Sequence, residues 1–324
     1  MATQSKVHIG LDIGGTKMLA VAYDESYNVL ARSRCKTKGN EGKEAVLGRV
    51  ERSISNVIEE FGASTDSVAT IGIGCPGQVN MTDGTVIGAV NIGWDNVKLA
   101  EFVRARYACP VTVINDVDAG VFGESQFGVA KDAVNVLGVF PGTGIGGGAV
   151  IDGKIVSGNH HSAMEIGHMQ IIPNGVRCGC GQIGCAETVA SRLAIAAQAA
   201  QAAYRGQAPW LLEHAGTDIS LIRSGVLASA IENGDTVIER IIKRACRHLG
   251  HIIGSVVNLI NPEVVVLGGG LVEAMPELFV THTQKHASKH CIPVLKNTFE
   301  VRAASLGDDA NVLGAAAWAV NNQT

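Results

Sequence analysis

Short apolar runs separated by glycine-rich turns fill the first third of the chain, and this pattern predicts strands. Residues 7–13 and 16–24 are two apolar runs on either side of Gly14-Gly15, as is typical of a β-hairpin. Strands are also predicted at 27–35, 67–77 and 110–119, the last one running into the start of a helix. Apolar side chains recur at helical spacing within 44–62 and 99–108.

A second strand–turn–strand pattern follows at 133–158. Shifting the first pattern forward by 128 residues brings three identical pairs into register: Gly10 with Gly138, Gly14 with Gly142, and Asp24 with Asp152. The identities and the shared layout indicate an internal duplication.

The second half of the chain contains long helical segments around one buried strand. Helices are predicted at 185–206 and 235–260, and Asn261-Pro262 ends the second of them. The run at 263–270 predicts a buried strand that leads into a glycine-rich turn, and 313–322 predicts a final helix. No linker or low-complexity tract separates the halves, so any domain boundary is expected at a hinge.

The composition agrees with an α/β fold. A length of 324 residues favours two domains, and 46% hydrophobic with only 4% aromatic residues implies a core of aliphatic side chains, as in buried parallel strands. The net charge of −4, without a dense Lys/Arg block, argues against nucleic acid or a membrane surface as partner. The start of the chain has no signal-peptide pattern, and the eight cysteines do not suggest a disulfide framework, so we expect a cytoplasmic protein.

Residues 165–187 hold the most informative motif. An H-x9-C-x-C-x4-C cluster is formed by His168, Cys178, Cys180 and Cys185. An imidazole and three thiolates suit tetrahedral Zn²⁺, and four protein ligands would make the zinc structural. The alternative, buried cysteines with a core histidine, fits poorly with a Cys-Gly-Cys-Gly turn. Glu165 and Glu187 flank the cluster, so a metal would aim both carboxylates at one small polar ligand.

The turn after the first predicted strand could approach a phosphate chain. Its candidate residues are Asp12, Gly14, Gly15, Thr16 and Lys17. The glycines let successive N–H groups point at one phosphate, the hydroxyl and the ammonium group add contacts, and the carboxylate could hold Mg²⁺ or its water. On these residues alone, an ordinary hairpin turn is an equally good interpretation.

Two further glycine-rich turns follow strand-like runs. Residues 141–148 contain the G-x-G-x-x-G spacing of dinucleotide-binding proteins, but that fingerprint opens a helix, whereas the strand-like GAVIDGKIV follows here. Candidate phosphate contacts are instead Gly142, Thr143 and Gly144, and the third turn consists of Gly268, Gly269 and Gly270. Three such turns suggest one nucleotide lying across them, and chance use of glycine is the alternative.

Asn115 and Asp116 stand where a predicted strand ends and a helix begins. An acid at such a strand end is a typical general base. A helix N-cap is at least as good an interpretation of the same residues. Asp118 and Glu124 are expected on the surface of the following helix.

Together these motifs resemble the ROK family of bacterial sugar kinases and sugar-responsive repressors over nearly the whole chain. LDIGGTK and GVFPGTGIGGG resemble its two phosphate motifs, INDVDAG its catalytic strand end, and VVLGGG its adenosine motif. EIGHMQI and CGCGQIGCAE resemble its signature and zinc loop. Met164 departs from the family, in which glycine is common before EIGH, and could crowd the sugar loop.

The resemblance implies an actin/hexokinase-like (ribonuclease H-like) fold, in which two duplicated α/β domains enclose a cleft. The expected small domain comprises 1–115 and a returning C-terminal helix at 306–324, and the large domain comprises 116–305 with the zinc loop at 165–187. A homodimer or homotetramer is also implied.

The resemblance further implies an ATP-dependent hexose kinase that uses Mg²⁺, contains structural Zn²⁺, and phosphorylates the 6-hydroxyl of glucose. Asp116 would be the catalytic base. The implied sugar contacts are Asn115, Asp116, Glu165, His168 and Glu187. One ring nitrogen of His168 would bind zinc and the other a sugar hydroxyl.

Two alternatives remain. The kinase could act on fructose, mannose, N-acetylglucosamine or N-acetylmannosamine instead. A sugar-sensing regulator lacking its DNA-binding domain is less favoured, because the first phosphate motif begins by residue 12 and Asp116 is in place.

Overall fold

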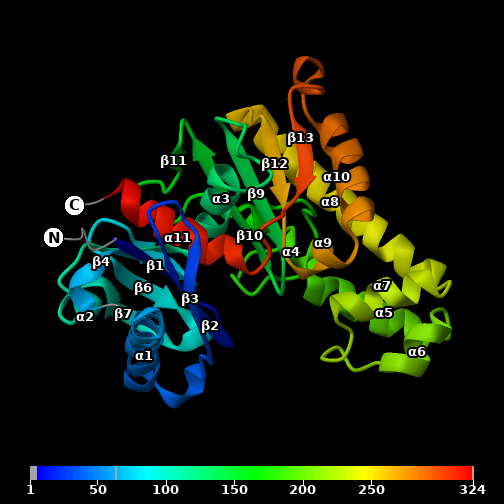
Figure 1. Cartoon of the computed structure of the whole chain (residues 1–324). Coiled ribbons are helices and arrows are strands. Elements are labelled where there is room, and N and C mark those ends of the chain that lie inside the picture. The colour runs from blue at the N-terminus through cyan, green and yellow to red at the C-terminus, as the bar shows by residue number, and fades with distance from the viewer. Residues whose placement is uncertain (1–5, 63, 323–324) are drawn as a thin grey trace. The chain divides into compact units, whose positions relative to one another are not determined.

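The computed structural model describes residues 6–62 and 64–322, which belong to two compact units. Unit 1 comprises residues 1–131, 155–163 and 308–324, and unit 2 comprises 132–154 and 164–307. Each unit is built around one five-stranded sheet (Figure 1).

The sheet of unit 1 has the strand order β3-β2-β1-β4-β8. Its strands are β1 (Val7–Ile13), β2 (Lys17–Tyr23), β3 (Val29–Lys36), β4 (Val68–Cys75) and β8 (Val111–Asn115). The first three strands form an antiparallel meander, and β4 and β8 continue from β1 in parallel. The predicted hairpin and the three further strands are therefore confirmed.

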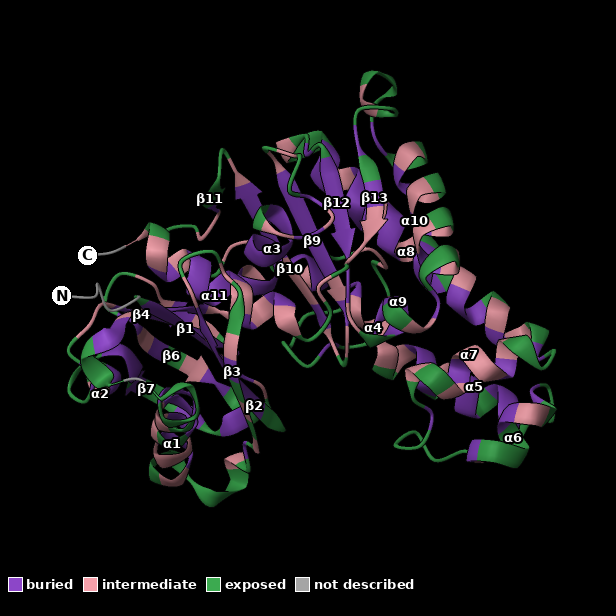
Figure 2. Cartoon of the chain, in the orientation of Figure 1, coloured by how far each residue is buried: buried purple, intermediate pink, exposed green. Residues whose placement is uncertain are grey.

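Helices cover both faces of this sheet, which explains why β1, β2 and β4 are buried on both sides. Helix α1 (Lys43–Phe61) packs on one face, and α11 (Asp309–Asn321) packs on the other against β1 and β4. Because side chains alternate along a strand, Ile9 and Leu11 join the core on the α1 side, whereas Gly10 and Asp12 fall on the α11 side. Figure 2 shows the resulting buried strands.

Glycines on the second face bring the backbone of α11 directly onto the sheet. A Cβ atom built on Gly10 would lie 2.0 Å from the carbonyl oxygen of Val312, and one on Gly72 would lie 1.8 Å from that of Ala315. No larger residue fits there without moving the helix.

The rest of unit 1 surrounds this sheet. A small antiparallel sheet is formed by β5 (Gln78–Asn80), β6 (Thr85–Ala89) and β7 (Trp94–Lys98), followed by α2 (Leu99–Arg104) and later by α3 (Asp116–Gln126). Three 3₁₀ turns lie at η1 (Gly39–Glu41), η2 (Thr65–Ser67) and η3 (Val90–Ile92). The sequence analysis did not predict the small sheet, whose strands are three to five residues long.

The sheet of unit 2 repeats the topology of unit 1, with the strand order β11-β10-β9-β12-β13. Its strands are β9 (Val136–Pro141), β10 (Ile145–Ile151), β11 (Lys154–Ile155), β12 (Val264–Leu267) and β13 (Glu300–Ala303). As in unit 1, the hairpin pair β9–β10 is antiparallel, and the pairs β9–β12 and β12–β13 are parallel. Two sheets with one strand order support the internal duplication read from the glycine spacing.

The helices of unit 2 enclose an aliphatic core. They are α4 (Glu187–Ala190), α5 (Arg192–Tyr204), α6 (Pro209–Ala215), α7 (Ser224–Glu232), α8 (Thr236–Ile260), α9 (Gly270–Ala274) and α10 (Pro276–His290). Two 3₁₀ turns lie at η4 (Ile166–His168) and η5 (Pro293–Leu295). Helix α8 packs most extensively on α10. No helix among residues 6–62 and 64–322 has the length and apolarity needed to cross a membrane.

Three sequence expectations differ from the structure in detail. The helix expected at 185–206 is broken at Ser191, whose Oγ accepts the Ala194 N–H and so caps α5. The helix expected at 99–108 ends at Arg104. Helices α6, α7, α9 and α10 and strand β13 were not predicted.

The division into units also differs from the expected boundary between residues 115 and 116. Residues 116–131 belong to unit 1, because α3 packs on α11. Glycines allow this contact as well: a Cβ on Gly314 would lie 1.9 Å from the carbonyl oxygen of Ala119.

Candidate functional site

The four residues of the Cys/His motif come together in unit 2. Their ligand atoms all lie within 4.8 Å of one another. The Nδ1 atom of His168 is 3.6 Å from Sγ of Cys178, and Sγ of Cys180 is 3.7 Å from Sγ of Cys185. For a tetrahedral ion with Zn–S bonds of about 2.3 Å, neighbouring sulfur atoms lie about 3.8 Å apart, so this donor set fits Zn²⁺.

A tight loop holds the cluster in place. The Cys178 N–H donates to the carbonyl of Gln182 at 2.8 Å, and the Gly181 N–H donates to the carbonyl of Cys178 at 2.9 Å. Gly181 has φ +93°, a left-handed conformation that favours glycine. The Cys-Gly-Cys-Gly segment is thus a turn, as the sequence indicated, although Cys178 and Cys185 are themselves buried.

Glu187 links the cluster to the β9–β10 turn. It is the first residue of α4, and its Oε1 lies 3.5 Å from Sγ of Cys178. Its Oε2 accepts the Ile145 N–H at 3.1 Å and occupies the space that a side chain at Gly144 would fill. One carboxylate therefore contacts both the candidate zinc loop and the candidate phosphate turn.

Glu165 and Met164 stand just before the cluster. Glu165 is exposed and precedes η4, which ends at His168. Met164 has φ +60°, so the residue that replaces the family's glycine adopts a conformation favouring glycine, at a cost of about 1 kcal/mol. Its side chain packs on the core of unit 2.

The turn of Gly142, Thr143 and Gly144 joins β9 to β10, so a strand follows it and the rejection of a dinucleotide fingerprint is confirmed. The Gly142 N–H donates to the Gly144 carbonyl at 2.8 Å. Arg192, the first residue of α5, donates from its backbone to the Gly142 carbonyl at 2.8 Å and from Nη2 to Oγ1 of Thr143 at 3.0 Å.

The third glycine turn lies next to the second. Strands β9 and β12 are parallel neighbours, and a Cβ on Gly269 would lie 3.5 Å from the carbonyl oxygen of Pro141. Gly269 has φ +87° and caps the short helix α9, and Gly270 faces Oγ of Ser224. The two turns therefore meet at the same end of the sheet of unit 2.

The first glycine turn belongs to unit 1 and is held by hydrogen bonds. The Gly14 N–H donates to the Lys17 carbonyl at 2.9 Å, and Oγ1 of Thr37 donates to the Gly14 carbonyl at 2.6 Å. The Thr37 N–H also donates to the Thr16 carbonyl. Lys17 Nζ lies 2.8 Å from Oδ2 of Asp308, just before α11.

Asp12 and Asp116 both lie beside Gly74 in unit 1, close enough for their charges to interact. Burial, followed by the negative charge of Asp116, raises the pKa of Asp12 to about 7, and Asn311 of α11 donates to Asp12 Oδ1 at 3.2 Å. Burial also raises the pKa of Asp116. A carboxylate whose burial favours the protonated form is suited to accept a proton from a substrate.

Asn115 is the N-cap of α3. Its Oδ1 accepts the N–H groups of Val117 at 2.8 Å and Asp118 at 3.2 Å, so the cap interpretation is confirmed for Asn115. The expectation that Glu124 lies on the helix surface is wrong: its side chain is fully buried and accepts the Val129 N–H at 3.0 Å, because the chain after α3 folds back over it.

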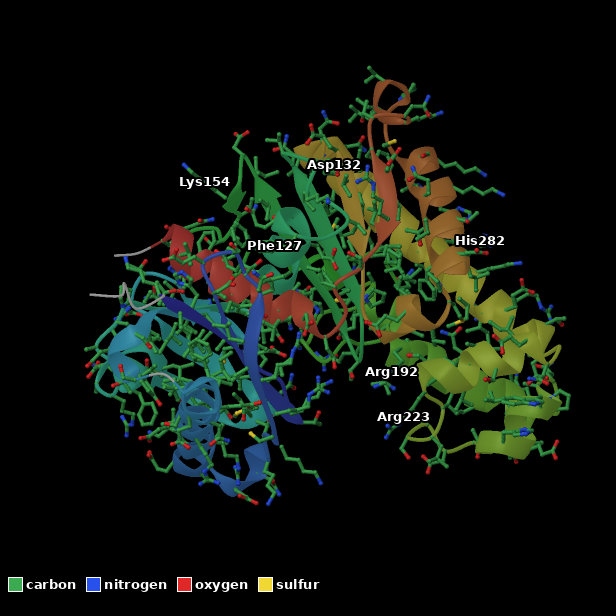
Figure 3. The ribbon with its side chains drawn as sticks, viewed as in Figure 1. Phe127, Asp132, Lys154, Arg192, Arg223 and His282 are labelled. Atoms are coloured by element: carbon green, nitrogen blue, oxygen red, sulfur yellow. The ribbon has the colours of Figure 1, made fainter. Side chains whose placement is uncertain are left out.

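The residues predicted from the sequence do not include Arg192, Ser224, Asp308 or Asn311, which lie next to these turns. Asp308 and Asn311 are almost 300 residues from the motif that they contact. No local pattern signals such contacts. Figure 3 shows the Arg192 side chain projecting from the ribbon of unit 2.

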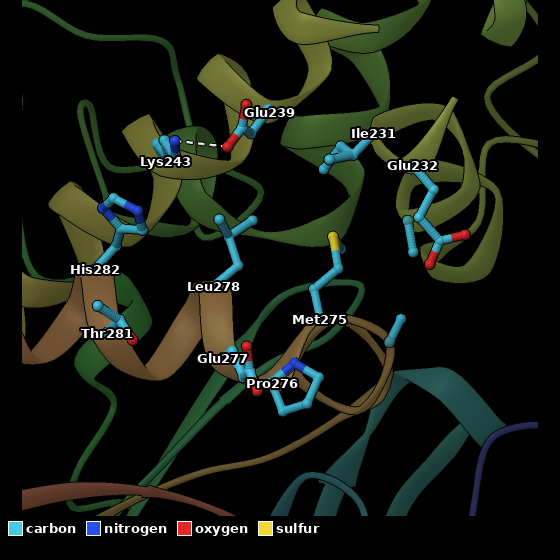
Figure 4. A pocket seen from close by; sticks show the side chains of 12 residues that line it. Ile231, Glu232, Glu239, Lys243, Met275, Pro276, Glu277, Leu278, Thr281 and His282 are labelled. Atoms are coloured by element: carbon cyan, nitrogen blue, oxygen red, sulfur yellow. Dashed lines mark ion pairs between the residues drawn. The ribbon is translucent and has the colours of Figure 1, made fainter. Parts of the chain in front are cut away.

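A separate cavity of about 570 Å³ lies between α7, α8 and α10 (Figure 4). Its floor is apolar, and its rim carries the Glu239–Lys243 ion pair. None of the predicted site residues lines this cavity.

Known proteins match this chain over nearly its whole length. The model of the ROK family matches residues 8–322. A glucokinase of Halalkalibacterium halodurans is 31% identical over 98% of this chain and 95% of its own, and one of Streptomyces coelicolor is 34% identical over 95% and 96%.

A solved structure extends this similarity to three dimensions. The crystal structure of a ROK family glucokinase from Streptomyces griseus, in complex with glucose and AMPPNP, matches with a TM-score of 0.83 at 31% identity. The match covers 98% of this chain and 100% of the other. With the two duplicated sheets, it confirms the expected actin/hexokinase-like fold.

Proposed function

The chain belongs to the ROK family, and from this premise we propose that it is an ATP-dependent hexose kinase that phosphorylates the 6-hydroxyl of glucose. The structural relative that binds glucose and AMPPNP supports this assignment of substrates. The single observation that carries it is the bridge made by Glu187. Its carboxylate contacts Cys178 of the candidate zinc loop and Ile145 directly after the second glycine turn, so the proposed sugar-binding and phosphate-binding segments share one anchor.

The proposed sugar contacts are Asn115, Asp116, Glu165, His168 and Glu187. Nδ1 of His168 faces the cysteines, which leaves Nε2 for a sugar hydroxyl. Carboxylates and an imidazole suit a polyol because they accept or donate several hydrogen bonds in fixed directions.

Zinc is proposed at His168, Cys178, Cys180 and Cys185. Zn²⁺ bound there would act structurally, since four protein ligands leave no open position. By fixing the loop it would orient Glu187 and the imidazole of His168.

The donor ATP is proposed to lie along the glycine turns. The residues involved are Asp12, Gly14, Gly15, Thr16, Lys17, Gly142, Thr143, Gly144, Gly268, Gly269 and Gly270. Mg²⁺ would neutralise the phosphate charge, with Asp12 holding the ion or its water.

Asp116 is proposed as the general base. Its carboxylate takes the proton of the 6-hydroxyl while that oxygen bonds to the γ-phosphorus, and the bond from this phosphorus to the β–γ bridging oxygen breaks to release ADP. The raised pKa of Asp116, caused by burial, strengthens it as a proton acceptor.

A sugar panel tests the proposal. The purified chain is incubated with ATP, Mg²⁺ and each of glucose, fructose, mannose, N-acetylglucosamine and N-acetylmannosamine, and ADP release is measured. The highest kcat/KM is expected with glucose, and a higher value with another sugar would reassign the substrate. Asp116→Asn should lower kcat by about 10²–10⁴-fold while glucose affinity stays nearly unchanged. Near-normal turnover by this variant would remove Asp116 as the base.

A further inference from the structure

We propose that Arg192 binds the terminal phosphates of the nucleotide donor and thereby selects nucleoside di- and triphosphates over monophosphates. This inference rests on the proposed kinase function, because it assigns a new residue to the donor site. It concerns the side chain of Arg192, which none of the phosphate motifs contains.

Arg192 is attached to the second glycine turn at two points. Its backbone N–H donates to the Gly142 carbonyl at 2.8 Å, and its guanidinium donates to Oγ1 of Thr143 at 3.0 Å. It is also the first residue of α5, so the capped start of a 13-residue helix fixes its backbone. The guanidinium group thus lies beside the turn, where solvent and a ligand can reach it.

The charge of Arg192 is not neutralised by any carboxylate in the described part of the chain. Its one side-chain hydrogen bond there goes to a neutral hydroxyl. A guanidinium has five N–H donors, so most of them remain available. By contrast, Arg32 and Arg302 of the same protein are each paired with a carboxylate.

Phosphate is the partner that this arrangement fits. A planar guanidinium binds phosphate oxygens through two parallel hydrogen bonds, and a glycine turn lets backbone N–H groups approach the same group. Because Arg192 contacts Thr143 in the middle of the turn, any phosphate bound at Thr143 lies within reach of its remaining donors. A purely structural role would require only the bonds already made.

Nucleotide binding by the full chain separates these two roles. Arg192→Gln removes the charge but keeps an amide donor for Thr143, and Arg205→Gln at the exposed end of α5 is the matched control. Dissociation constants for ATP, ADP and AMP are measured by isothermal titration calorimetry with Mg²⁺ present. The loss of charge-assisted hydrogen bonds predicts an ATP affinity about 10- to 100-fold lower for Arg192→Gln, with AMP affinity within about twofold. Arg205→Gln should match the parent protein.

Several outcomes would overturn the inference. These are an unchanged ATP affinity in Arg192→Gln, an equal loss for AMP and ATP, or no ATP binding by the parent protein. If Arg192→Gln does not fold, Arg192→Lys provides the comparison, and it should bind ATP more weakly than the parent while AMP binding is kept. If the parent binds ATP but phosphorylates no sugar, the proposed function fails, while the ATP-to-AMP comparison still decides the role of Arg192.

Discussion

The contact between α11 and the sheet of unit 1 allows a quantitative test of the fold. A Cβ atom on Gly72 would lie 1.8 Å from the carbonyl oxygen of Ala315 and 2.4 Å from its carbonyl carbon. Both are helix backbone atoms, which cannot rotate aside as a side chain can. To reach ordinary contact at 3.4 Å, the helix must move away from the strand by more than an ångström.

Gly72→Ala should therefore destabilise the protein strongly. Overpacking of a core costs typically 1–3 kcal/mol, and a clash with rigid backbone belongs at the upper end, about 3 kcal/mol. For a unit of this size, such a loss lowers Tm by about 6–12 °C. The displaced helix would also carry Asp308 away from Lys17 and Asn311 away from Asp12, so KM for ATP should rise.

The matched control is Gly48→Ala in α1. A Cβ on Gly48 meets nothing within 4 Å, and alanine favours a helix over glycine, so this variant should gain about 0.5–1 kcal/mol. Thermal and urea unfolding of both variants, followed by circular dichroism, give the comparison. If Gly72→Ala unfolds within 2 °C of the parent protein, the proposed close packing of α11 on β4 is incorrect.

Three further predictions concern the candidate site. Cys180→Ser should lose bound zinc, measured by mass spectrometry of the metal, and should lower Tm and sugar affinity together; fully active protein without zinc would contradict this. Lys17→Ala should raise KM for ATP more than KM for sugar, since Lys17 directly follows the first glycine turn and is a proposed phosphate contact, and the opposite pattern would contradict that role. Asp12→Asn should stabilise the fold at pH 8 more than at pH 5. Burial raises the pKa of Asp12 to about 7, so the destabilisation by this carboxyl group grows as pH rises towards 7 and is fully present at pH 8. Urea unfolding at both pH values tests this, and an equal effect would refute it.

Local patterns determined much of this protein. The Cys/His set lies within 18 residues, so loop geometry alone brings its atoms to within 4.8 Å. Alternating apolar residues around glycine turns predicted both hairpins, and helical spacing predicted α1 and α8 nearly to their ends. In each case the interacting residues are close in sequence, and their spacing is the physical signal.

Contacts between distant segments depended on tertiary structure. The ion pair of Lys17 with Asp308 and the hydrogen bond from Arg192 to Thr143 each join residues that are far apart in sequence and are brought together by packing. No local pattern in the sequence explains why positions 10 and 72 are glycine. The backbone of α11 packs so closely on these two positions that a larger side chain would not fit. Sequence alone thus indicated the candidate chemical groups, because chemistry resides in residue types. The neighbours that position those groups became visible only in the tertiary structure, where helices pack on the sheets.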